Sequence, residues 1–133
     1  MGKPSYKVFY KEYSVKLYRI AENDLYAAEF LLNAPMCRPE LIIYQAQQAV
    51  EKLIKAVIVH QEKPMPLTHD IELLMADLDS DDIKILPECA GELTKYVTIK
   101  RYTEGDEVLS PKDILAAIEV GKIFLSCAKA KLF

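Results

Sequence analysis

Apolar residues recur at intervals of three and four positions along most of the chain, and this spacing predicts α-helices. The first helix is expected from about Lys11 to Asn33, and the sequence Asn33-Ala34-Pro35 ends it. One carboxylate, that of Asp24, falls on its apolar face. The apolar positions of that face are Tyr13, Leu17, Ile20, Ala27, Ala28 and Leu31.

A second helix is expected from about Pro39 to His60, because proline suits a first helical position. Its apolar residues fill an arc of about 200°, whereas an ordinary surface helix needs a stripe of about 100°. This helix is therefore predicted to be central, with neighbours on two sides. The arc holds Ile42, Ile43, Ala46, Ala49, Val50, Leu53, Ile54, Ala56, Val57 and Ile58, with Gln47 inside it. The opposite side holds Tyr44, Gln45, Gln48, Glu51, Lys52 and Lys55.

Three further segments follow. After the proline-bearing loop 63–67, Thr68 is predicted to cap a short third helix. A fourth, irregular helix is expected over 82–100, where Pro87 and Gly91 interrupt the pattern. Ser110-Pro111-Lys112-Asp113 has the form of a helix start, and the last helix should run to within a residue or two of Phe133.

The predicted fold class is all-α, an antiparallel up-and-down bundle of four to five helices. The chain of 133 residues has the size of one domain, expected to span 1–133 with a core at about 11–130. No apolar run is long enough to cross a bilayer, and no secretion signal follows Met1. The sequence therefore predicts a cytoplasmic protein without a membrane partner.

Composition narrows the function. Seventeen basic and 20 acidic residues give a net charge of −3, which disfavours a general nucleic-acid binder and leaves room for a local basic patch. The three cysteines, Cys37, Cys89 and Cys127, contain no Cys-x-x-Cys pair. No phosphate-binding glycine loop, dinucleotide fingerprint or metalloprotease motif is present. We therefore expect no metal and no cofactor.

Two polar groups on the first two predicted helices are candidate functional or structural sites. A carboxylate on an apolar face is costly unless it is paired, so Asp24 should meet a basic or hydroxyl partner from another helix. Gln48, Glu51, Lys52 and Lys55 share one helix face because they are spaced i, i+3, i+4 and i+7. That face is either a solvated stripe with local ion pairs or a polar wall that takes a phosphate or a partner.

Two more candidates lie outside those helices. Arg101 and Tyr102, which follow Lys100, combine cations with an aromatic ring, a set that binds phosphate and stacks on a base but also occurs at ordinary helix ends. His69 and Asp70 are adjacent, so on a helix they point about 100° apart, and capping or local hydrogen bonding is expected rather than metal binding.

Taken in order, these segments resemble the HEPN domain, named for nucleotide binding in higher eukaryotes and prokaryotes. The resemblance covers about residues 11 to 130. The segments that carry it are Ala21-x-x-Asp24-Leu25-x-x-Ala28-x-x-Leu31-Leu32, Gln47-Gln48-Ala49-Val50-Glu51-Lys52-Leu53-Ile54-Lys55-Ala56, Thr68-His69-Asp70-Ile71-x-x-Leu74 and Arg101-Tyr102.

The resemblance implies a helical bundle that forms a homodimer. Many prokaryotic members are encoded beside a minimal nucleotidyltransferase as toxin–antitoxin modules, and others are metal-independent endoribonucleases with an Arg-x4–6-His motif. Arg101 matches the arginine of that motif, but positions 106–108 hold Asp106, Glu107 and Val108 instead of histidine. The nuclease is therefore expected to be absent.

The sequence thus predicts a non-catalytic HEPN protein that dimerises and binds a nucleotide, RNA or a minimal nucleotidyltransferase. Candidate ligand-binding residues are Arg101, Tyr102, Lys52, Lys55 and Gln48. Candidate members of a structural polar network are Asp24, Glu51, His69 and Asp70. The alternatives are an endoribonuclease toxin that uses Arg101 with an unconventional acid, and a purely structural interaction module.

Overall fold

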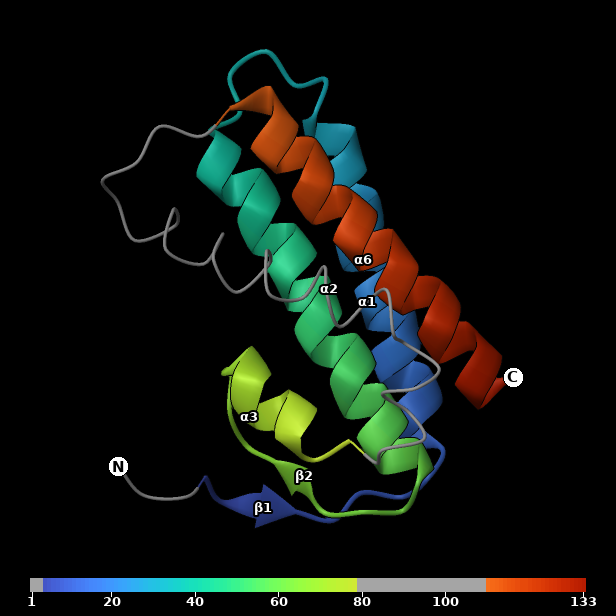
Figure 1. Cartoon of the computed structure of the whole chain (residues 1–133). Coiled ribbons are helices and arrows are strands. Elements are labelled where there is room, and N and C mark those ends of the chain that lie inside the picture. Colours follow the sequence, from blue (N-terminus) through green and yellow to red (C-terminus); the bar gives the residue numbers. More distant parts are fainter. Residues whose placement is uncertain (1–3, 79–109) are drawn as a thin grey trace.

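The computed structural model describes residues 4–78 and 110–133, and within them the chain is a helical bundle (Figure 1). Its helices are α1 (Tyr13–Leu31), α2 (Pro39–His60), α3 (Ile71–Ala76) and α6 (Pro111–Leu132). Two short strands, β1 (Tyr6–Lys7) and β2 (Met65–Pro66), pair in antiparallel register. The all-α class is therefore confirmed. The fourth helix predicted at 82–100 lies outside the described residues.

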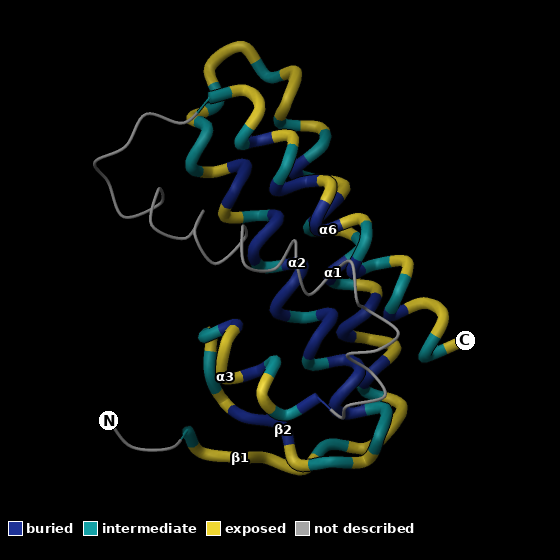
Figure 2. The backbone as a smooth tube through the Cα atoms, in the orientation of Figure 1, coloured by how far each residue is buried: buried dark blue, intermediate teal, exposed yellow. Residues whose placement is uncertain are grey.

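Helix α2 begins and ends where the sequence predicts. Pro39 occupies the first turn, and the preceding Arg38 has extended backbone dihedrals of −73° and 136°. Every residue of the predicted apolar arc is buried, and so is Gln47 inside it. Figure 2 shows buried residues recurring along the length of α2. The wide arc is needed because α1, α3 and α6 all contact α2.

Helix α1 packs against both α2 and α6. It runs antiparallel to α6, because Leu25 lies against Gly121 while Tyr18, about two turns earlier, meets Phe133 beyond the end of α6. Its buried positions are Ser14, Leu17, Tyr18, Ala21, Leu25 and Ala28, whereas the predicted face members Tyr13, Ile20, Ala27 and Leu31 are only half-buried. The buried stripe is rotated from the prediction because α1 contacts two helices at once.

Helix α6 starts with the predicted cap. The Ser110 hydroxyl accepts a hydrogen bond from the Asp113 backbone N–H at 3.2 Å, and the Asp113 carboxylate accepts one from the Ser110 backbone N–H at 3.0 Å. This reciprocal capping box satisfies donors that the first turn leaves without helical partners. Further along, a Cβ added at Gly121 would lie 2.7 Å from Leu25 Cδ1, so the glycine permits the close approach of α6 to α1.

The structure differs from the sequence prediction at two points near α3. Asp70, rather than Thr68, is the N-cap: its side chain accepts hydrogen bonds from the backbone N–H groups of Glu72 at 2.9 Å and Leu73 at 3.4 Å. The β1–β2 pair was not predicted, because two residues per strand are too few to show a period of two. In the described ranges, no helix combines the length and hydropathy that a bilayer crossing requires.

Candidate functional site

The polar side of α2 is partly enclosed rather than solvated. The predicted polar face consists of Gln48, Glu51, Lys52 and Lys55, which we call the polar row. Three of its members are half-buried, and Glu51 is only 3% exposed. A carboxylate at that depth requires partners, since a buried unpaired charge is strongly destabilising. The polar row is therefore a network embedded in the fold.

Asp24 on α1 pairs with Lys52 of the polar row. The Lys52 Nζ donates to Asp24 Oδ2 at 2.5 Å, and the two side chains are 26% and 19% exposed, respectively. The expected basic partner from another helix is thus confirmed, and its identity is established. Because the ammonium faces this carboxylate, Lys52 links α2 to α1 and has its charge compensated within the bundle.

Glu51 reaches the loop that precedes α3. The His69 Nδ1 lies 3.1 Å from Glu51 Oε2, and the His69 side chain is 83% exposed while that of Glu51 is 3% exposed. A carboxylate at Nδ1 favours the ring tautomer that carries its proton there, which fixes the orientation of the imidazole. The buried acid therefore anchors one edge of an otherwise exposed histidine.

The rest of the Thr68-His69-Asp70 sequence forms the start of α3. Thr68 Oγ1 accepts a hydrogen bond from the Asp70 N–H at 3.1 Å, and Asp70 in turn caps the helix. The two polar side chains hold the loop in a turn. His69 is thereby presented to Glu51, so this short sequence connects the α3 start to the polar row.

Lys55 lies at the end of the polar row nearest the C-terminus of α2. Burial lowers the pKa of its ammonium group, the nearby Glu51 charge raises that pKa, and the Lys52 charge lowers it. Among these described residues, two acids, Asp24 and Glu51, accompany two lysines, Lys52 and Lys55. This part of the row is balanced in charge, unlike a cationic surface built to attract phosphate from solvent.

Arg101 and Tyr102 lie outside the described residues, as do Lys100 and positions 106–108 that follow them. The structure therefore brings together Asp24, Glu51, Lys52, Lys55 and His69, and leaves the predicted phosphate-binding pair to be argued from the sequence. The burial of Glu51 is the feature that sequence reasoning missed. Its position at the border of the apolar arc, about 20° around the helix from Ile58, was the available signal.

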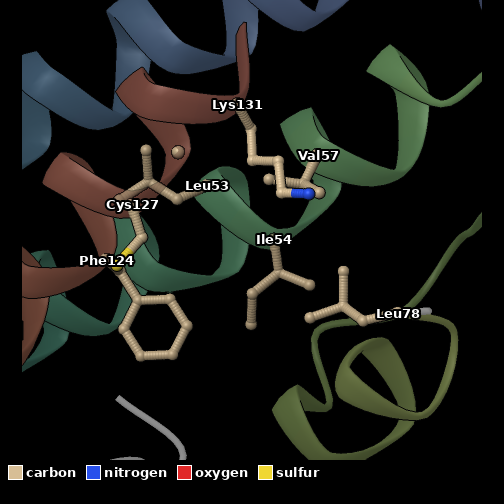
Figure 3. A pocket seen from close by; sticks show the side chains of 8 residues that line it. Leu53, Ile54, Val57, Leu78, Phe124, Cys127 and Lys131 are labelled. Carbon is tan, nitrogen blue, oxygen red and sulfur yellow. The ribbon is translucent and has the colours of Figure 1, made fainter. Parts of the chain in front are cut away.

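An apolar pocket lies on the other side of α2. Figure 3 shows Leu53, Ile54 and Val57 of α2 facing residues of α6, with Leu78 closing one side. Among the described residues, its lining consists of Leu53, Ile54, Val57, Leu78, Phe124, Cys127, Ala128 and Lys131. Only about 10 Å³ of it is open to water-sized molecules, which is about the room that one water needs. The pocket is a packing gap and shares no residue with the polar row.

No metal-binding arrangement of three or more histidine, cysteine, aspartate or glutamate side chains is found in residues 4–78 and 110–133. Among the residues that the fold gathers, Asp24 pairs with Lys52 and Glu51 contacts His69, while Lys55 lies near Glu51 and Lys52. The arrangement thus resembles an internal polar network more than a ligand set for an ion.

Comparison with known proteins gives a family and a fold. The family model described as the HEPN domain matches residues 14–131. A crystal structure of TT1696 from Thermus thermophilus is similar, with a TM-score of 0.67 and 21% sequence identity over 89% of this chain and 97% of that one. At that identity the likeness concerns the fold alone. No curated protein matches the chain.

Proposed function

This chain belongs to the HEPN domain family, and on that premise we propose that it is a non-catalytic cytoplasmic member that forms a homodimer and binds a nucleotide, RNA or a minimal nucleotidyltransferase, as in a toxin–antitoxin module. One observation carries the proposal. Where the ribonucleases resembled by this sequence have a histidine after the arginine, positions 106–108 hold Asp106, Glu107 and Val108. Two carboxylates in that place repel a phosphate and supply no imidazole.

The two histidines of the chain support this assignment. Neither follows an arginine by the spacing of the nuclease motif. His69 contacts the buried Glu51 at the start of α3, and His60 lies in the last turn of α2, where burial lowers its pKa. Each thus has a local structural setting of its own.

Within the polar row, the contacts of each side chain distinguish candidates for ligand binding from candidates for a structural role. Lys52 is compensated by Asp24, so its contribution to ligand binding is indirect, through the position of α2 against α1. We assign phosphate contact to Arg101 and base stacking to Tyr102, with Lys55 and Gln48 bordering the ligand. Arginine suits this role because its planar guanidinium donates two parallel hydrogen bonds to phosphate oxygens.

The test is nucleotide-dependent stabilisation of the purified full chain. A ligand that binds only the native state at 100 times its dissociation constant stabilises it by about 2.7 kcal/mol. We expect ATP, GTP or AMP to raise the melting temperature of the wild type and not that of Arg101→Ala. Arg38→Ala, which replaces an exposed arginine before α2, is the matched control and should respond like the wild type. Cleavage of RNA by the wild type that is lost in Arg101→Ala would overturn the non-catalytic assignment.

Homodimerisation is the second part of the proposal. It is supported by large apolar side chains left exposed on two helices, Phe30 of α1 at 69% and Leu115 of α6 at 56%. Exposed apolar surface of this kind is typical of interaction sites when it is contiguous. Multi-angle light scattering should give twice the chain mass of 15.1 kDa at micromolar concentration. A single-chain mass under those conditions contradicts this part.

The second candidate function is a metal-independent endoribonuclease that uses Arg101. The observation that favours it is the Glu51–His69 pair, because a buried carboxylate that orients an exposed imidazole is a common setting for acid–base chemistry. This candidate predicts RNA cleavage that is lost in both His69→Ala and Arg101→Ala. A protein that neither cleaves RNA nor binds a nucleotide, RNA or a minimal nucleotidyltransferase is the purely structural interaction module.

A further inference from the structure

The segment before α1 is held against the bundle, and most of its side chains, though not that of Phe9, are exposed to solvent. In β1, Tyr6 and Lys7 pair with Pro66 and Met65 of β2, and the Leu67 N–H donates to the Ser5 carbonyl at 2.7 Å. Met65 is 5% exposed and anchors this short sheet in the core. Figure 2 shows β1 in the colour of exposed residues beside the buried β2. The backbone of the segment is therefore held in place, and its exposed side chains are available to a partner.

Three aromatic residues and two lysines stand close together in this segment, which we call the N-terminal platform. Its sequence is Tyr6-Lys7-Val8-Phe9-Tyr10-Lys11. Tyr10 is 88% exposed and Tyr6 is 48% exposed. Both rings are amphipathic and offer a flat face to solvent. Rings at this level of exposure add little to the core, so their stacking surface is available to a partner.

One ring contact ties the N-terminal platform to α1, and a second orders the platform itself. The rings of Phe9 and Tyr13 stack with centroids 4.6 Å apart and planes 11° apart, and Tyr13 is the first residue of α1. The Lys7 Nζ lies 5.1 Å from the centroid of Phe9. Such a cation–π contact keeps the ammonium near the segment. The Phe9–Tyr13 stack thus helps to define the positions of Lys7 and Tyr10, which lie on either side of Phe9 in the sequence.

The platform carries two lysines, Lys7 and Lys11, in a chain of net charge −3. The pKa of His60 is lowered first by burial and then by the charges of Lys11 and Lys131, while Glu62 acts in the opposite direction. Lys11 and Lys131 are therefore both near enough to His60 to disfavour its protonation. Exposed lysines of this kind attract the phosphates of polyanions.

We propose that the N-terminal platform binds single-stranded nucleic acid, with bases stacked on Tyr10 and Tyr6 and phosphates contacted by Lys7 and Lys11. Flat aromatic surfaces beside cations are the combination that sequence-tolerant single-strand binding requires, because every base has a π-face and every nucleotide a phosphate. This site goes beyond the proposed function, since it shares no residue with Arg101, Tyr102 or the polar row.

Fluorescence anisotropy of labelled oligonucleotides of about a dozen residues tests the platform with the full-length chain. We expect Tyr10→Ala to weaken binding roughly 5- to 150-fold, the range that loss of one stacked base implies. Tyr26→Ala, which removes a ring that is 71% exposed on α1, is the matched control and should bind like the wild type. RNA and DNA oligonucleotides of the same sequence distinguish binding of single-stranded RNA from binding of single-stranded DNA.

Salt dependence tests the lysines separately. For single strands, the logarithm of the binding constant falls with the logarithm of salt concentration by about 0.7 per phosphate contact. Replacing Lys7 and Lys11 by serine should therefore reduce the slope by about 1.4. Replacing the exposed Lys16 and Lys112 together is the charge control. This change should reduce the salt slope by less than the Lys7 and Lys11 substitutions do.

Three outcomes overturn the platform: a wild type that binds no oligonucleotide, equal losses in Tyr10→Ala and Tyr26→Ala, or a salt slope that the Lys7 and Lys11 substitutions leave unchanged. If the platform instead contacts a protein, the wild type binds no oligonucleotide. Failure of the proposed function gives a different result. In that case mononucleotides do not raise the melting temperature and Arg101→Ala changes nothing, whereas Tyr10→Ala still weakens oligonucleotide binding. Circular dichroism melting of every platform variant and its controls should match the wild type, since the replaced side chains are exposed.

Discussion

Breaking the Asp24–Lys52 pair should destabilise the bundle through an interaction that is much stronger than a surface ion pair. The perturbation is a double-mutant cycle of Asp24→Asn, Lys52→Met and the two together. Each single substitution leaves one charge without the partner that stands 2.5 Å away in the native protein. The double substitution removes both charges, so it avoids that penalty.

The burial of the pair sets the expected magnitude. Exposed ion pairs couple by about 0.2–1 kcal/mol, and removing one partner of a fully buried pair costs about 3–5 kcal/mol. The Lys52 and Asp24 side chains are 26% and 19% exposed, which places them between these limits. We therefore expect each single substitution to lower the free energy of unfolding by about 2 kcal/mol, and the coupling energy to be about 1–2 kcal/mol.

Urea denaturation followed by circular dichroism gives the four free energies of unfolding, on the condition that the slopes agree among the variants. The matched control is the Arg19–Glu22 pair on α1, whose side chains are 59% and 45% exposed and whose coupling should stay below about 0.5 kcal/mol. Asp24→Asn and Lys52→Met effects that add within about 0.5 kcal/mol would refute the reasoning. In the same variants, Asp24→Asn should not tighten nucleotide binding; a gain would identify Lys52 as a phosphate ligand.

The remaining predictions concern the caps, the helix contact and pH. Ser110→Ala should lower the free energy of unfolding by about 1 kcal/mol in urea titrations, because the capping box is lost. Hydrogen bonds from the Ser110 backbone and hydroxyl lower the pKa of Asp113, so its stabilisation is present above about pH 3.9 and is lost on further acidification; wild type and Asp113→Asn should converge there in pH-dependent melting. Gly121→Ala gains about 1 kcal/mol of helix propensity but overpacks against Leu25 at a cost of about 1–3 kcal/mol, so calorimetry should record a net loss, with increased stability as the contrary result. The lowered pKa of His60 means that the native state disfavours its protonation, so wild-type stability should fall as pH drops through about 6.5 while His60→Gln should not show this component.

The sequence was most informative where local chemistry and burial agree. Helix α2 begins at Pro39 and its apolar arc is buried throughout, because a helix that is apolar over so wide a sector has no stable position other than the centre. The start of α6 was equally predictable, since Ser110 and Asp113 satisfy each other within one turn. Both features depend on residues close together in sequence.

Features that depend on distant residues were less accessible. The sequence required a partner for Asp24, but several lysines qualified, and only packing of α1 on α2 selects Lys52. Thr68 and Asp70 are both good capping residues, and the extended backbone of Asp70 decides between them. Glu51 was grouped with a polar face because periodicity does not record that the loop before α3 covers that face.

These contacts separate two roles, stability of the bundle and recognition of a ligand, that the family resemblance does not distinguish. The residues that identify the family on α1 and α2 are largely engaged with other residues of the fold, Asp24 with Lys52 and Glu51 with His69. Residues engaged in this way are constrained by the stability of the bundle, so their presence is compatible with loss of the nuclease and says little about ligands. Ligand recognition is better sought among exposed cations beside exposed rings. In the described residues Lys7 and Lys11 with Tyr10 meet that description, which is why the oligonucleotide experiment is more decisive for function than substitutions within the polar row.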